Sequence, residues 1–172
     1  GNGHYTAWWT PTAYGPATID IEAVNSFGAS TVQHVSINVV QTASDTIVQA
    51  FSGITLSADS GDTKIVDGIV PSNLGAYDTI IATLSVTCPS GGCGAWDRIS
   101  SIDVQSPEGN WFELIRYITP YGTACTHKMD VTDYRSLLQG KVTFRANCGT
   151  TDNGYIYELK LEYKEGTPTH SY

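Results

Sequence analysis

The residues best suited to chemistry are consecutive: Trp96, Asp97 and Arg98, which follow closely on Cys88 and Cys93. They offer a flat aromatic face, a carboxylate and a guanidinium. A carboxylate can take a proton from water as a general base, and an aromatic face can stack on a sugar ring. The structural alternatives are that Asp97 pairs with arginine or caps loop amides, and that Trp96 packs in the core. Asp97 is therefore the candidate catalytic residue, and all three are candidate ligand-binding residues.

These residues lie at the exit of a tight turn. Strand-like runs enter the turn at Ile80–Thr87 and leave it at Ile99–Gln105. Between the runs, Pro89 and three glycines supply the backbone freedom that a tight bend needs. The sequence therefore predicts a rigid corner that presents the aromatic ring, the carboxylate and the guanidinium together.

The sequence contains four cysteines, for which three pairings are possible. Cys88 and Cys93 are close enough in sequence to form a local bridge across the turn, which leaves Cys125 to pair with Cys148. An even cysteine count in a composition typical of extracellular proteins favours both disulfides. The alternatives are four free thiols in a cytosolic protein and a zinc site, but no histidine lies near the one closely spaced cysteine pair.

Asp59, Asp62 and Asp67, with neighbouring glycines, offer oxygen ligands for a calcium ion. Their spacing matches no EF-hand loop, so a solvated hairpin is the favoured interpretation and the three are weak calcium candidates. The histidines are scattered along the chain, at His4, His34, His127 and His170. We therefore predict neither a histidine-based metal site nor a cofactor.

Composition indicates the class of protein. The 172-residue chain has a formal net charge of −8, 15% charged residues and ten tyrosines. Tyrosine, valine and threonine favour strands, and negative charge argues against nucleic acid and anionic membranes as partners. No run approaches the roughly 20 apolar residues of a membrane span, so we expect no membrane insertion. We expect an extracellular or cell-surface protein and, because no signal peptide follows Gly1, a mature fragment or an excised segment.

Residues 1–43 are predicted to be the end of a separate domain. Apolar and polar residues alternate over Thr18–Val24 and again over Thr31–Val40, with a turn at Asn25–Gly28 between them. This pattern resembles the last three strands of a bacterial immunoglobulin-like repeat. The resemblance implies that strands of that type precede the main domain. Gln41–Asp45 is polar and short, and we interpret it as a linker.

From Thr46 onward, period-two alternation and regularly spaced turns predict about eight to ten strands. The alternation is clearest over Tyr155–Tyr163, where every second residue is tyrosine or leucine. Val142–Ala146 alternates in the same way, and Asp133–Leu138 is the one segment predicted to form a helical turn. Because no segment sustains a period of 3.6 residues, we predict an all-β antiparallel sandwich.

Ordered sequence blocks in this region resemble a known family. They are Cys88-x4-Cys93-x2-Trp-Asp-Arg98, Arg116-Tyr-Ile-Thr-Pro-Tyr121, Asp130-Val-Thr-Asp133 and Leu137-Leu138-x-Gly140. The blocks are similar, in order and spacing, to the first jelly-roll domain of the peptide-N-glycosidase F family, over roughly residues 46–166. The resemblance implies a jelly roll over residues 44–168 of a secreted, glycan-directed protein from a bacterium of the Bacteroidetes. Residues 169–172 are then expected to begin a linker to a further jelly roll.

The same resemblance implies roles for single residues. The family releases N-linked glycans from asparagine by amide hydrolysis, in which a carboxylate activates water and other acids steady the substrate and leaving group. Asp97 falls on the family's principal catalytic aspartate. Asn147 stands where the family carries a second acid, and a third acid lies on the second jelly roll. An asparagine can hydrogen-bond but cannot transfer a proton. The implied ligand-binding surface is Trp96, Asp97, Arg98 and Asn147.

Two functional hypotheses follow. The first is a non-catalytic glycan-binding, adhesion or structural module of a larger secreted or cell-surface protein. The second is a fragment of an N-glycan amidase whose second jelly roll lies outside this sequence. Under both, the expected partners are glycans or glycoproteins and neighbouring domains of the same polypeptide. We expect the isolated chain not to release N-glycans at a detectable rate, because it retains Asp97 alone among the family's acids.

Overall fold

The structure is a computed structural model that describes residues 6, 8, 9, 15–39, 44–149 and 152–168. The chain divides into two units, residues 1–42 and residues 43–172. The immunoglobulin-like resemblance covers three strands, and most of the segment 9–15 that leads into β1 lies outside the described residues. The predicted linker segments at 41–43 and 169–172 also lie outside them.

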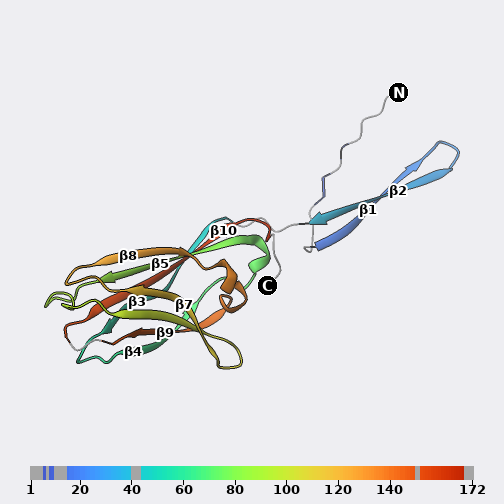
Figure 1. The fold of residues 1–172 in the computed structure, drawn as a ribbon. Helices are drawn as coiled ribbons and strands as arrows, with labels where there is room; N and C mark the ends of the chain where they lie inside the picture. Colours follow the sequence, from blue (N-terminus) through green and yellow to red (C-terminus); the bar gives the residue numbers. More distant parts are fainter. Residues whose placement is uncertain (1–5, 7, 10–14, 40–43, 150–151, 169–172) are drawn as a thin grey trace. The chain divides into compact units, whose positions relative to one another are not determined.

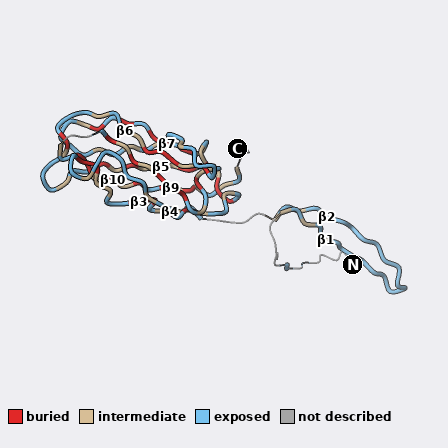
Figure 2. The backbone as a smooth tube through the Cα atoms, turned by 90° about the horizontal axis from the view of Figure 1, so that it is seen from below, coloured by how far each residue is buried: buried red, intermediate tan, exposed pale blue. Residues whose placement is uncertain are grey.

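The described part of the N-terminal unit includes a two-stranded antiparallel hairpin. β1 (Gly15–Val24) pairs along its whole length with β2 (Ser30–Val39), where the alternation predicts two strands (Figure 1). The side-chain oxygen of Asn25 accepts hydrogen bonds from the backbone N–H groups of Phe27 and Ala29, which fixes the turn. No residue of β1 or β2 is buried, as the pale blue and tan trace shows (Figure 2). The assignment of this hairpin to an immunoglobulin-like domain therefore stays a prediction.

The C-terminal unit is a sandwich of two four-stranded antiparallel sheets, with strand orders β3-β10-β5-β8 and β4-β9-β6-β7 (Figure 1). Eight strands distributed over two packed sheets in this order form a jelly roll. The predicted all-β antiparallel jelly roll is confirmed. The strands are β3 (Thr46–Leu56), β4 (Thr63–Ile69), β5 (Tyr77–Thr87), β6 (Ile99–Gln105), β7 (Trp111–Ile118), β8 (Cys125–Asp130), β9 (Lys141–Cys148) and β10 (Tyr155–Glu165).

The hydrophobic core lies between the two sheets, where the trace is red in Figure 2. β10 supplies much of it, because every second residue of this strand is fully buried: Tyr155, Tyr157, Leu159, Leu161 and Tyr163. The residues between them are partly buried or exposed. Burying a side chain of this size contributes roughly 1.5–3 kcal/mol. The inward face of β10 is therefore the face that the period-two alternation predicts.

One strand was not predicted from the sequence, whereas the predicted helical turn is present. β8 was not predicted as a strand, because its residues Cys-Thr-His-Lys-Met-Asp contain few strongly apolar side chains; it is an edge strand with one partly buried face. The predicted helical turn is present as the 3-10 helix η2 (Thr132–Leu137), and a shorter one, η1 (Leu74–Ala76), precedes β5. Within the described ranges, no helix has the length and apolar character needed to cross a membrane.

One of the two predicted disulfides is present. Cys88 and Cys93 are bonded, with their Cα atoms 4.3 Å apart. Cys125 and Cys148 are free thiols, so the predicted second disulfide is wrong. Cys125 lies on β8 in one sheet and Cys148 ends β9 in the other (Figure 1). The sulfur of Cys125 lies 3.3 Å from Nε2 of His127 on its own strand, whereas Cys148 is buried in the core.

Candidate functional site

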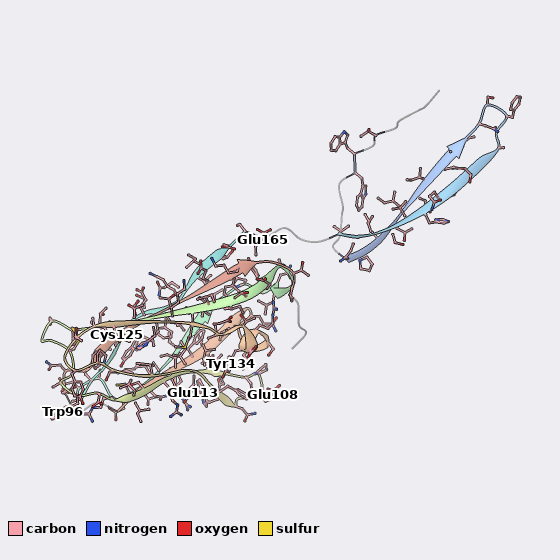
Figure 3. The ribbon with its side chains drawn as sticks, turned by 45° about the horizontal axis from the view of Figure 1, so that its top comes forward. Trp96, Glu108, Glu113, Cys125, Tyr134 and Glu165 are labelled. Atoms are coloured by element: carbon pink, nitrogen blue, oxygen red, sulfur yellow. A yellow bond between two sulfur atoms is a disulfide. The ribbon has the colours of Figure 1, made fainter. Side chains whose placement is uncertain are left out.

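The loop of residues 88–98, here called the stapled loop, connects β5 to β6 at one end of the jelly roll. Figure 3 shows Trp96 at this end, far from Glu108 in the turn between β6 and β7. Inside the disulfide, the N–H of Gly92 donates to the carbonyl of Pro89 at 2.9 Å. Gly92 has a φ of 92°, a conformation that favours glycine. The tight corner that the sequence predicts is therefore present.

The predicted site residues Trp96 and Asp97 are exposed, and Arg98 is partly buried. Trp96 is 61% exposed, so it does not pack in the core as a tryptophan beside a disulfide more often does. Thr119 fixes the exit of the loop: its N–H donates to the Arg98 carbonyl, and its hydroxyl accepts from the Arg98 N–H, both at 2.9 Å. The loop thus presents an open aromatic face beside a carboxylate.

Tyr121, from the loop after β7, contacts the stapled loop directly. Its hydroxyl donates a hydrogen bond to the Asp97 carboxylate, and this bond and the negative charge raise the pKa of Tyr121 above its ordinary value. The backbones of the two loops are also joined, because the N–H of Gly122 donates to the carbonyl of Gly94 at 2.9 Å. A role for Tyr121 was not predicted, because a contact between two loops has no local sequence signature. The residue was named only as the end of the block Arg116–Tyr121.

Exposed apolar side chains adjoin this pair. Ile99 and Ile118 lie opposite each other on β6 and β7 and are 70% and 59% exposed. Their strands lead directly into the loops that carry Trp96 and Tyr121. We call Trp96, Asp97, Ile99, Ile118 and Tyr121 the Asp97 corner. A surface that combines apolar faces with a few polar groups suits a ligand with both apolar and hydrogen-bonding faces.

Asn147 lies on the outer face of β9, and its hydrogen-bond partners come from β4 and β6 rather than from the stapled loop. Its Nδ2 donates to Ser101 Oγ at 3.1 Å and to Asp103 Oδ2 at 2.8 Å. Its Oδ1 accepts from the hydroxyl of Thr63 at 3.0 Å. Both amide hydrogens are therefore used inside the protein. A ligand at this position meets only the carbonyl oxygen of Asn147.

Asp103 is a buried carboxylate that sequence analysis did not identify. It is 5% exposed, and its Oδ2 accepts from Nε and Nη2 of Arg145 at 2.9 and 2.7 Å. The guanidinium of Arg145 also lies over the ring of Trp111, 4.4 Å from its centroid. Together with the hydrogen bond from Asn147, Oδ2 of Asp103 accepts three hydrogen bonds. The only sequence signal for the Asp103–Arg145 pair is that opposite charges occur on two strands with alternating apolar and polar residues. That signal does not reveal that the two strands are neighbours.

The calcium candidates are not brought together. Asp67 lies on β4, where its carboxylate is 2.8 Å from Lys141 Nζ and accepts from the hydroxyl of Thr143 at 2.7 Å. The hydrogen bond from Lys141 is the main cause that lowers the pKa of Asp67. Asp59 and Asp62 lie in the turn between β3 and β4. In the part of the chain that the structure describes, no three His, Cys, Asp or Glu side chains form a group that could hold a metal ion.

Comparison with solved structures identifies similar proteins. PNGase F, a glycosylasparaginase from Flavobacterium meningosepticum, superposes with a TM-score of 0.69 and 24% identity over 76% of this chain and 45% of its own. Recombinant N-glycanase F gives the same coverage and TM-score at 25% identity. A peptide-N(4)-(N-acetyl-β-D-glucosaminyl) asparagine amidase matches at 25% identity over 74% of this chain and 44% of its own, with a TM-score of 0.69.

The matches cover part of each protein. No family model and no curated protein matches the sequence. The chain spans less than half the length of the solved proteins. The similarity covers about three quarters of this chain, and the two sheets form the expected jelly roll. The chain therefore contains a PNGase F-like jelly-roll domain.

Proposed function

We propose that this chain is part of an N-glycan amidase and that its Asp97 corner meets the glycan-bearing asparagine of a glycoprotein. One observation carries the proposal: Asp97 is exposed on a disulfide-stapled loop, beside the exposed ring of Trp96, in a fold similar to PNGase F. A stapled loop keeps a carboxylate in place with little loss of entropy on binding. The setting we propose is extracellular or cell-surface, where such a disulfide persists.

In the proposed reaction, water attacks the side-chain amide carbon of the glycosylated asparagine. Asp97 takes a proton from this water, and the bond from carbon to the glycosyl nitrogen breaks. Tyr121 donates a hydrogen bond to Asp97 and so orients the carboxylate. The departing nitrogen needs a proton, and Asn147 cannot supply one. We propose that a neighbouring domain of the same polypeptide supplies the second acid.

The second candidate is a non-catalytic glycan-binding module, and the hydrogen bonds of Asn147 favour it. Both N–H groups of Asn147 are committed to Ser101 and Asp103, so this side chain donates nothing to a tetrahedral intermediate. Removing one such stabilising group typically costs about 10²–10³-fold in rate. In this version Trp96 and Tyr121 hold a sugar and Asp97 accepts hydrogen bonds from its hydroxyl groups.

A glycopeptide separates the two candidates. Binding and release are measured with the chain and with Trp96→Ala and Asp97→Asn variants, and Trp9→Ala is the matched control because Trp9 is also exposed, at 54%, but lies in the other unit. Both candidates predict binding that Trp96→Ala weakens and Trp9→Ala leaves unchanged. The isolated chain lacks the proposed second acid, so release is measured with the chain joined to the neighbouring domain that carries it. Release that Asp97→Asn abolishes there supports the amidase, and binding without release there supports the module. Absence of binding would contradict both.

A further inference from the structure

Tyr155, the first residue of β10, links the two loops of the Asp97 corner. Its side chain is fully buried, and its hydroxyl donates to the carbonyl of Gly94 at 2.9 Å. The same hydroxyl contacts the carbonyl of Pro120. Gly94 belongs to the stapled loop, and Pro120 directly precedes Tyr121. A hydroxyl has one hydrogen, so a single buried proton is shared between one carbonyl from each loop.

The residues just before Tyr155 hold the stapled loop as well. The Asp152 carboxylate accepts from the N–H of Ala95 at 3.0 Å, and the N–H of Gly94 donates to the carbonyl of Gly154 at 2.9 Å. Ala95 is two residues from the catalytic candidate. The position of the loop is therefore set from the start of β10, in addition to its own disulfide.

Packing at this contact leaves little room for adjustment. A Cβ atom at Gly94 would lie 2.7 Å from Oδ1 of Asp152, closer than real Cβ atoms approach, and 3.0 Å from Cε2 of Tyr155, a very tight contact. The backbone of the stapled loop thus rests directly on the tyrosine ring. Because that ring is part of the hydrophobic core, the sandwich interior fixes the loop.

We propose that Tyr155 is the positioning residue of the Asp97 corner, which holds Asp97 and Tyr121 in contact by fastening both of their loops to the core. It acts through Gly94 and Pro120 and touches no ligand. This role deepens the proposed function and rests on it, because positioning Asp97 matters only if Asp97 acts on a ligand. The spatial claim, however, concerns the contact between Asp97 and Tyr121, and this contact can be measured without a glycan.

The test uses Tyr155→Phe, which removes the hydroxyl and keeps the ring. Tyr163→Phe is the matched control, because Tyr163 lies on the same strand, is fully buried and donates to the carbonyl of Leu138 at 2.9 Å. Titration of the Tyr121 phenol, followed by NMR on tyrosine-labelled chain, reports the contact. Asp97→Asn identifies the signal, since loss of the carboxylate charge should lower the pKa of Tyr121.

We expect Tyr155→Phe to lower the pKa of Tyr121 toward its ordinary value and Tyr163→Phe to leave it unchanged. Both variants should lose a similar amount of thermal stability, since each loses one buried hydrogen bond. Amide exchange at Ala95 and Gly122 should rise about tenfold in Tyr155→Phe alone. An unchanged Tyr121 titration in Tyr155→Phe would overturn the proposal. So would an unfolded variant, because the hydroxyl would then hold the whole sandwich rather than two loops.

Glycopeptide binding separates this inference from the proposed function. If the unaltered chain binds, Tyr155→Phe should weaken binding by about tenfold, the usual effect of one lost buried hydrogen bond that positions a site. If the unaltered chain does not bind, the proposed function fails, and the Tyr121 titration still decides whether Tyr155 positions the loops.

Discussion

Asn147 donates an amide hydrogen to the buried carboxylate of Asp103 at 2.8 Å, on an oxygen that already accepts two hydrogen bonds from Arg145. An acid at position 147 would face a second acid at the same separation. Like charges in contact disfavour the ionised form of both. The amide at position 147 and the carboxylate at position 103 therefore fit each other, and this part of the outer face is organised around a single negative charge.

Replacing Asn147 by aspartate should destabilise the chain by about 2 kcal/mol at neutral pH, because two carboxylates then share one site. Folding raises the pKa of one of them above its unfolded value. The protonated form is tolerated, so the penalty should be large at about pH 7 and shrink as the pH falls toward about 4. Urea unfolding at both pH values measures it. Asn147→Ser, which adds no charge, is the control and should show little dependence on pH.

Asp103→Asn should cost about 2–3 kcal/mol, because it breaks a buried ion pair and leaves Arg145 without its partner. The matched control is Glu113→Gln on the same sheet. Glu113 accepts two hydrogen bonds from Arg116, at 2.8 and 2.7 Å, but is exposed. That variant should change the free energy of unfolding by less than about 1 kcal/mol. Chemical denaturation compares the two, and equal losses would contradict the anchoring role of Asp103.

The denatured, unreduced chain should react with two equivalents of thiol reagent, from Cys125 and Cys148. After reduction the number should rise to four, because the Cys88–Cys93 bond opens. Loss of that short bridge should lower stability by about 2 kcal/mol. A chain with no reactive thiol before reduction would restore the second disulfide, which is absent from the structure.

The chain should lose stability above about pH 10. Burial raises the pKa values of Tyr117, Tyr157 and Tyr163, so these phenols stay protonated in the folded chain. In the unfolded chain they ionise above about pH 10, which favours unfolding by about 1.4 kcal/mol per pH unit for each group. Urea midpoints measured from neutral to alkaline pH follow this loss. Tyr157→Phe should make the decline shallower, and an identical slope would contradict the assignment.

The sequence predicted features that a local pattern determines. Alternation over Tyr155–Tyr163 identified the face of β10 that is buried, and the spacing of Cys88 and Cys93 identified the bonded pair. It failed where the answer depends on which side chains become neighbours in the folded chain. Cys125 and Cys148 look like a pair in a cysteine count, but the jelly-roll topology puts them in different sheets.

The site shows the same division. Asp97 could be chosen from residue type and family spacing, whereas its contact with Tyr121 joins two loops that are distant in sequence. Tyr155 looked like one more core tyrosine, because alternation predicts burial but not the partner of a hydroxyl. Contacts of this kind arise only when the tertiary fold brings backbone carbonyls to a buried donor.

The paired charges on the outer face of β9 also bear on how fast a partner can find this surface. Asp67 forms an ion pair with Lys141, and Asp103 forms one with Arg145. The opposite charges of each pair therefore largely cancel at a distance. The net charge of −8 must therefore act mainly from other parts of the chain. These pairs therefore add little local attraction or repulsion for a partner that docks on this face. Any dependence of the association rate on ionic strength should therefore arise from the charges on the rest of the chain.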